Sequence, residues 1–132
     1  MSAVADLFEN DLDEILTPGM TLMEYNEEAM NLGFYEDMLI YPALGLAGEA
    51  GEVANKVAKL VRDKDLMDLD PIVDLEMEDK LEIARELGDV LWMVTATAND
   101  IGFDLDEIAA MNLSKLKDRA KRGTLQGSGD NR

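Results

Sequence analysis

Two pairs of carboxylates lie inside otherwise apolar stretches of the sequence, Glu49 with Glu52 and Glu86 with Asp89. Residues three apart share a face of an α-helix, so each pair would point both carboxylates in one direction. Two such helices facing each other would bring four carboxylates together. Like charges this close repel one another unless a cation lies between them. The two pairs therefore predict a magnesium-type metal site.

The spacing alone carries little information, because acids three residues apart occur nine times among the 29 acidic residues of the chain. A solvated helix face or a helix cap accounts for most of these pairs. The Glu49 and Glu86 pairs differ from the others because Leu, Val, Ala and Gly flank them on both sides. Carboxylates this close to a core are bound to metal or neutralised by Lys and Arg. The residues by themselves leave both alternatives open.

Composition narrows the chemistry that such a site can perform. The chain of 132 residues has a formal net charge of −17, which argues against binding a nucleic-acid polymer through its phosphates. It contains no Cys and no His, so a disulfide, a thiolate zinc site and an imidazole base are all excluded. Any metal must be held by oxygen, which suits Mg²⁺, with Mn²⁺ as a substitute. Acid–base chemistry must come from carboxylates, Lys, Tyr or water.

A basic stripe near the end of the chain complements the carboxylates. Asn112, Lys115 and Arg119 fall on one face of a predicted helix, and five of the 12 basic residues lie between Lys115 and Arg122. Favourable charge at a helix C-terminus explains Lys121 and Arg122. Lys115 and Arg119 lie further inside the helix and are better candidates for binding phosphate.

Helices must position these side chains, because apolar residues recur at helical spacing and no β-strand alternation competes. Helices are expected over residues 22–31, 41–62, 74–100 and 104–122, with a weaker amphipathic segment over 5–16. Four principal helices with short links predict an all-α, antiparallel four-helix bundle.

The helix predicted over 41–62 has two neighbouring stripes. The apolar stripe consists of Leu46, Ala50, Val53, Val57 and Leu60, and the polar stripe beside it of Glu49, Glu52, Lys56, Lys59 and Asp63. This helix has no side chain at three positions, Gly45, Gly48 and Gly51. Each glycine costs about 1 kcal/mol relative to Ala, so we expect the close approach of another helix or of a ligand there.

Residues 1–20 are expected to form an N-terminal extension, 21–122 the functional domain and 123–132 a disordered tail. No stretch approaches the roughly 20 apolar residues that span a bilayer, and the acidic N-terminus lacks the basic region of a signal peptide. We therefore expect a soluble, cytoplasmic protein, located in the host cytoplasm if the chain is viral.

Three ordered motifs resemble the signatures of the MazG-like nucleotide pyrophosphohydrolases. Residues 41–56 (YPALGLAGEAGEVANK) resemble the first signature, and residues 85–92 (RELGDVLW) resemble the second. Residues 112–119 match the closing Asn-x-x-Lys-Leu-x-x-Arg pattern. The resemblance covers roughly residues 22–122. It implies an all-α enzyme of the NTP pyrophosphatase type whose four-helix bundle is completed by dimerisation, as a dimer or a dimer of dimers. Such an enzyme uses Mg²⁺ to cleave (deoxy)nucleoside triphosphates to monophosphate and pyrophosphate.

The resemblance also implies roles for individual residues. The metal ligands would be Glu49, Glu52, Glu86 and Asp89. The phosphates or the nucleotide would be held by Lys56, Asn112, Lys115 and Arg119. Tyr25 would border the base, and Glu49 or Glu52 would take the proton of the attacking water. An apparent insertion over residues 65–78 leaves the base preference open.

Two other classes of function compete with the enzyme. A non-catalytic helical adaptor would use its acidic faces to bind a basic partner. A carboxylate-bridged redox-metal bundle is disfavoured, because such bundles use His ligands and the chain has none.

Overall fold

The computed structural model describes residues 19–65, 70 and 74–123, and these residues form four helices with no strand. The helices are α2 (Leu22–Leu32), α3 (Ile40–Lys64), α4 (Met77–Asp100) and α5 (Leu105–Arg122). The predicted all-α class and the four principal helices are confirmed. The segment predicted over 5–16 and residues 124–132 of the predicted tail lie outside the described residues. Among the described helices, none is both long and apolar enough to cross a membrane.

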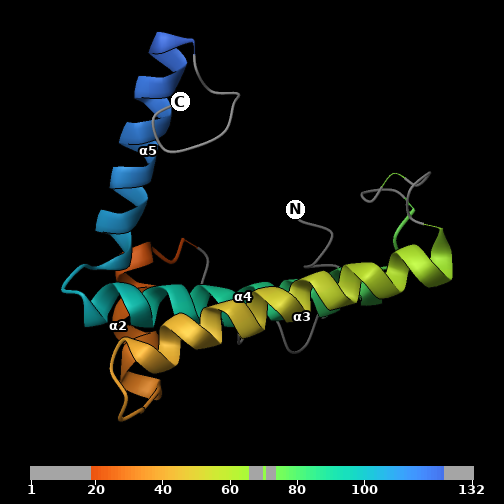
Figure 1. Ribbon diagram of the computed structural model, residues 1–132, viewed down its shortest axis with the longest axis horizontal. Helices are drawn as coiled ribbons and strands as arrows, with labels where there is room; N and C mark the ends of the chain where they lie inside the picture. Colours follow the sequence, from red (N-terminus) through yellow and green to blue (C-terminus); the bar gives the residue numbers. More distant parts are fainter. Residues whose placement is uncertain (1–18, 66–69, 71–73, 124–132) are drawn as a thin grey trace.

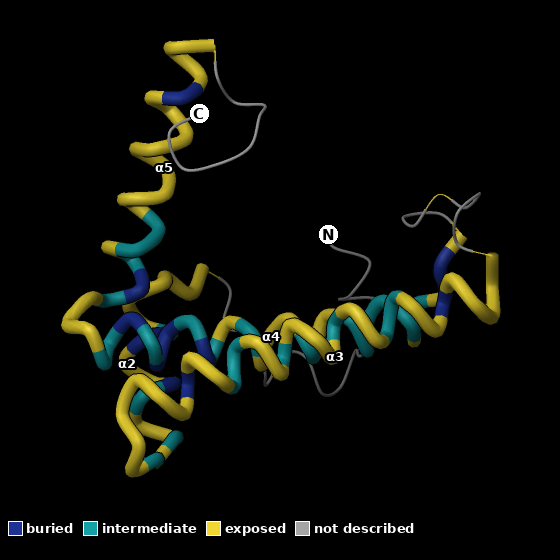
Figure 2. Tube along the Cα trace, viewed as in Figure 1, coloured by how far each residue is buried: buried dark blue, intermediate teal, exposed yellow. Residues whose placement is uncertain are grey.

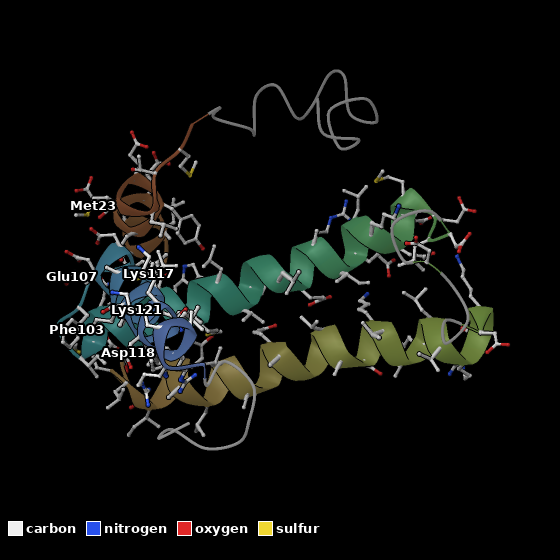
Figure 3. The ribbon with its side chains drawn as sticks, turned by 90° about the horizontal axis from the view of Figure 1, so that it is seen from above. Met23, Phe103, Glu107, Lys117, Asp118 and Lys121 are labelled. Carbon is white, nitrogen blue, oxygen red and sulfur yellow. The ribbon has the colours of Figure 1, made fainter. Side chains whose placement is uncertain are left out.

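The helices α3 and α4 form a long antiparallel pair, and α2 packs at the end of this pair where α3 begins and α4 finishes (Figure 1). Helix α5 leaves the same end and points away from the pair; it is seen almost end-on when the molecule is turned by 90° (Figure 3). Antiparallel packing within one chain is therefore confined to α3 and α4. In one chain α5 projects from the α3–α4 pair, so a closed four-helix bundle would need a further element packed against α5.

Local sequence signals set the ends of the helices. The Thr21 hydroxyl accepts a hydrogen bond from the Glu24 N–H (3.1 Å), and the Glu24 carboxylate accepts one from the Thr21 N–H (2.7 Å). This capping box satisfies two backbone donors that the first turn of a helix leaves open. Gly123, with φ of 69°, ends α5 in the left-handed conformation that glycine adopts easily.

Helix α4 begins at Met77 rather than at the predicted residue 74. The carboxylate of Asp74 accepts a hydrogen bond from the Asp70 N–H, and the Asp74 N–H donates to the Asp70 carbonyl, both at 2.7 Å. These two bonds hold the chain in a turn just before the helix. The Asp side chain favours such local bonds over helical ones.

Buried residues concentrate at the α2 end of the pair (Figure 2). The side chains there that are almost fully buried come from all four helices: Asn26, Ala29, Pro42, Met93, Thr95, Ala96, Ala98 and Leu105. Asn26 and Asn99 exchange hydrogen bonds of 2.8 and 3.2 Å, and the Leu105 N–H donates to Asn26 (3.0 Å). The amides of α2 and α4 thus fix where α5 begins.

The connection from α2 to α3 is held against α4 by its aromatic and polar groups. The indole of Trp92 donates to the Ala29 carbonyl (3.2 Å), and Tyr35 packs edge-on against Trp92 with ring centroids 5.9 Å apart. The Asp100 carboxylate accepts from the Tyr35 hydroxyl (2.9 Å) and from the N–H of Leu39 (2.6 Å). Leu39 has a φ of 65°, a strained value for a leucine, which the bond to Asp100 helps to hold.

Candidate metal centre

Three of the predicted ligands meet where α3 faces α4. Glu49, Glu86 and Asp89 each offer one carboxylate oxygen, and these atoms lie within 4.8 Å of one another. Glu49 and Glu86 are half-buried, and Asp89 is exposed. Helical spacing puts Glu86 and Asp89 on one face of α4, and the antiparallel packing brings that face to Glu49. We call these three residues the carboxylate cluster.

The fourth predicted ligand, Glu52, lies one turn further along α3 and is exposed, and its carboxylate does not belong to the cluster. Its negative charge still reaches Lys56, where it contributes to a raised pKa of the ammonium group. Glu52 therefore lies beside the cluster with its carboxylate open to solvent.

Lys56 forms ion pairs with one carboxylate of the cluster and with one carboxylate outside it. Its ammonium group lies 3.2 Å from Glu82 and 3.8 Å from Glu86, so this α3 lysine bridges two carboxylates of α4. The hydrogen bond to Glu82 is the main cause of the raised pKa of Lys56, with the charges of Glu82 and Glu86 adding to it. Glu82 is not among the site residues predicted from the sequence, because its pairing with Lys56 depends on how α3 packs against α4.

Tyr25 of α2 is half-buried, and desolvation together with the negative charge of Asp89 raises the pKa of its phenol. Tyr25 of α2 and Lys56 of α3 thus both interact electrostatically with carboxylates of the cluster.

The predicted residues of α5 do not join the cluster within one chain. Asn112 and Lys115 are exposed, and Arg119 is buried with 5 % of its surface accessible. Helix α5 packs on α2 and α4 near its beginning and makes no approach to α3 within the described residues. Among the described residues, no hydrogen bond or ion pair joins Lys115 or Asn112 to the three carboxylates of the cluster.

The donor set of the cluster fits a hard divalent cation. It consists of carboxylate oxygens alone, and the chain has neither His nor Cys to attract a softer metal. Three negative charges face the single positive charge of Lys56, so the site has an excess of negative charge that a cation would neutralise.

A known protein family matches the region of the sequence that contains the carboxylate cluster. The family model of the MazG nucleotide pyrophosphohydrolase domain matches residues 42–124. The Gene 37 protein of Mycobacterium phage L5 is 46 % identical over 94 residues, which cover 71 % of this chain and 76 % of that protein. No solved structure matches the chain. The matched residues include the whole carboxylate cluster and the basic stripe, and the chain therefore belongs to the MazG nucleotide pyrophosphohydrolase domain family.

Proposed function

We propose that the protein hydrolyses a (deoxy)nucleoside triphosphate to the monophosphate and pyrophosphate with Mg²⁺, for which Mn²⁺ can substitute. The observation that carries this proposal is the convergence of Glu49, Glu86 and Asp89 from two helices, with Lys56 beside them. In this proposal the enzyme works in the cytoplasm of a bacterium or of a phage-infected host, where it shapes or cleanses the nucleotide pool.

The positions of the residues support the following roles, which are part of the proposal. Glu49, Glu86 and Asp89 hold the metal, which when bound would offset the charge of the phosphates and lower the pKa of the attacking water. Glu52, solvent-open and beside the cluster, accepts the proton of that water or completes the ligand set. Lys56 orients the phosphates, and Tyr25 borders the nucleoside.

We further propose a homodimer, alone or paired into a tetramer, in which α5 of a second copy brings Asn112, Lys115 and Arg119 to the phosphates. In one chain α5 points away from the cluster, so its cations need another route to the substrate (Figure 1). Leucines are exposed on both surfaces that would meet: Leu87 and Leu91 on α4, and Leu113 and Leu116 on α5. The cations would stabilise the leaving pyrophosphate.

A pyrophosphate-release assay with Mg²⁺ across the common nucleotides tests the reaction. Glu49→Gln and Asp89→Asn are expected to lose at least about a hundredfold in kcat, because each removes a ligand of the metal that lowers the barrier. Glu28→Gln, at an exposed position of α2, is the matched control and should keep full activity. The absence of turnover with every nucleotide, together with metal binding unchanged in Asp89→Asn, would favour the acidic adaptor.

Mixing two inactive variants tests the shared site. Glu49→Gln damages the carboxylate cluster and Lys115→Ala damages the basic stripe, so a mixed dimer contains one site with neither substitution. We expect the mixture to recover activity that neither variant has alone. If the mixture stays inactive while the subunits exchange, α5 of the same chain must serve the site.

A further inference from the structure

Helix α3, which carries Glu49 and Lys56, has no cap formed by its own sequence. Helices α2 and α5 each begin with a capping box, whereas Leu39 precedes α3 without a side-chain cap, and the first turn of α3 contains no acidic residue. The N–H of Leu39 instead donates a hydrogen bond of 2.6 Å to the carboxylate of Asp100, the last residue of α4. We call this hydrogen bond the α3 anchor. The place where α3 begins thus depends on a contact with α4.

The α3 anchor holds both of its residues in unfavourable positions. Leu39 has a φ of 65°, which leucine rarely adopts. Asp100 puts a negative charge at the C-terminal end of α4, where the helix dipole disfavours it and no basic residue lies in the last turn. A backbone at this φ relaxes unless a bond holds it, so the start of α3 would move if the carboxylate of Asp100 were lost.

The α3 anchor lies in the same register of the helix pair as the carboxylate cluster. Glu49 follows Leu39 by ten residues, and Asp89 precedes Asp100 by eleven. These separations correspond to about 15 and 16.5 Å along the two helix axes. A shift at the start of α3 is therefore transmitted along the helix to Glu49 and changes its position relative to Asp89.

Other contacts between α3 and α4 hold this register less tightly. Gly45 lies against the side chain of Met93, which is flexible and adapts to its surroundings. The ion pair of Lys56 with Glu82 depends on the long, flexible side chain of a lysine. The α3 anchor joins a backbone N–H to a short side chain, so it fixes the position of α3 along α4 more closely than these contacts do.

We infer that Asp100 is a positioning residue for the metal centre. Its bond to the strained Leu39 fixes α3 along α4, so that Glu49 meets the two α4 carboxylates of the cluster. The inference rests on the proposed function, because it takes the cluster to be the metal site. Groups of a functional site must be held within about 0.5 Å of their productive positions, whereas a shift by one residue moves a helix by about 1.5 Å.

The affinity of the full-length protein for Mn²⁺, measured from the electron paramagnetic resonance of the free ion, tests this inference. Asp100→Ala should weaken Mn²⁺ binding by about tenfold or more, which is the usual effect of losing a group that orients metal ligands. Asp100→Asn should keep the wild-type affinity without the charge, because its carbonyl accepts from Leu39 and its amide donates to the Tyr35 hydroxyl. Adding Leu39→Gly to Asp100→Ala should restore part of the affinity, because glycine adopts a positive φ without strain.

Tyr35→Phe is the matched control. It removes the other hydrogen bond of the Asp100 carboxylate and leaves the α3 anchor in place. This variant should be less stable than the wild type but should bind Mn²⁺ equally well. If Asp100→Ala does not fold, Asp100→Glu replaces it, because the additional methylene displaces the carboxylate from Leu39 and should also weaken binding.

Several results would overturn the inference. They are an unchanged affinity in Asp100→Ala or its replacement Asp100→Glu, an equal loss in Asp100→Asn or Tyr35→Phe, no recovery with Leu39→Gly, and no binding of Mn²⁺ by the wild type. Pyrophosphate release separates the inference from the proposed function. A wild type that binds Mn²⁺ but hydrolyses no nucleotide rejects the reaction, and the Mn²⁺ affinities of the variants still decide the role of Asp100.

Discussion

Glu49, Glu86 and Asp89 place three negative charges within 4.8 Å of one another, and among the described residues Lys56 is the one cation that forms an ion pair with them, through Glu86. Repulsion of this kind destabilises the folded state unless a cation is bound. At the scale of single residues, the proposed function therefore gives these side chains a role that costs stability, as active-site residues often do.

Replacing one carboxylate of the cluster should stabilise the metal-free protein. We expect Glu49→Gln to raise the free energy of unfolding without Mg²⁺ by on the order of 1 kcal/mol, because one repulsive charge is lost. Mg²⁺ should raise the melting temperature of the wild type but not that of the variant. Thermal unfolding with and without Mg²⁺ measures both effects, and Glu28→Gln should behave like the wild type. A variant less stable than the wild type without Mg²⁺ contradicts the cluster as a site of repulsion.

The pKa of Tyr35 predicts how the stability of the fold changes at high pH. Burial and the hydrogen bond to Asp100 raise the pKa of its phenol from 10.0 to about 12. Because the pKa is higher in the folded state, this contribution to stability is fully present below pH 10 and is lost as the pH rises through 12. We expect Tyr35→Phe to lower the free energy of unfolding by about 1–2 kcal/mol at pH 8.

The difference between wild type and Tyr35→Phe should shrink between pH 10 and pH 12 in urea unfolding measured at each pH. A constant difference over this range contradicts the raised pKa. Tyr41→Phe is a suitable control, because no hydrogen bond of the Tyr41 hydroxyl is found among the described residues.

At the scale of elements, the glycines of α3 have different surroundings. A Cβ added to Gly45 would lie 2.7 Å from the sulfur of Met93, so this glycine allows α4 to come close. Gly48 and Gly51 have nothing within 4 Å of the added atom in the described structure. The close approach predicted for all three glycines is thus found at Gly45, and the other two face open space in one chain.

A pair of glycine substitutions separates packing from helix propensity. A Cβ on Gly33 would lie 2.2 Å from Cζ2 of Trp92, so Gly33→Ala should lower the free energy of unfolding by about 1–3 kcal/mol. Gly48→Ala meets no neighbour and should raise it by up to about 1 kcal/mol, because Ala favours the helix interior. Urea unfolding measures both values. A marked destabilisation in Gly48→Ala would mean that a second copy packs on α3 at that position.

At the scale of the whole molecule, much apolar surface is exposed. Leu32, Phe34 and Leu44 are 87 %, 89 % and 70 % exposed, and α5 adds Leu113 with 54 %. Exposed apolar surface that extends over several elements marks interaction sites in soluble proteins. Its extent here supports an assembly of several copies, in which the projecting α5 is covered.

The apolar face of α5 should control both assembly and activity. Leu113→Glu with Leu116→Glu would place charges in the proposed interface, and we expect a smaller assembly in sedimentation and at least a tenfold loss of pyrophosphate release. Ser114→Glu introduces one negative charge at an exposed polar position of α5 and is the control, with Leu113→Glu alone as the variant of equal charge. An unchanged mass with unchanged activity argues against this face as the interface.

The sequence by itself determined where the helices begin and end and which side chains are available at the candidate site. Helix boundaries near Thr21, Asp104 and Gly123 follow from caps formed within a few residues, and such signals can be read locally. The pairing of Glu86 with Asp89 on one face needs only the helical period. The lack of His and Cys means that any metal bound by this chain must be held by oxygen, and this needs no knowledge of the fold.

The tertiary structure alone decided which of these residues meet. It brought Glu49 to the α4 carboxylates, left Glu52 outside that group, and joined Lys56 to Glu82. It also turned α5 away from the pair, so the basic stripe and the carboxylates are separated within one chain. The direction of a helix depends on long-range packing, and for α5 this includes the hydrogen bond from the Leu105 N–H to Asn26. These two residues lie far apart in the sequence, so the bond forms only once the chain has folded.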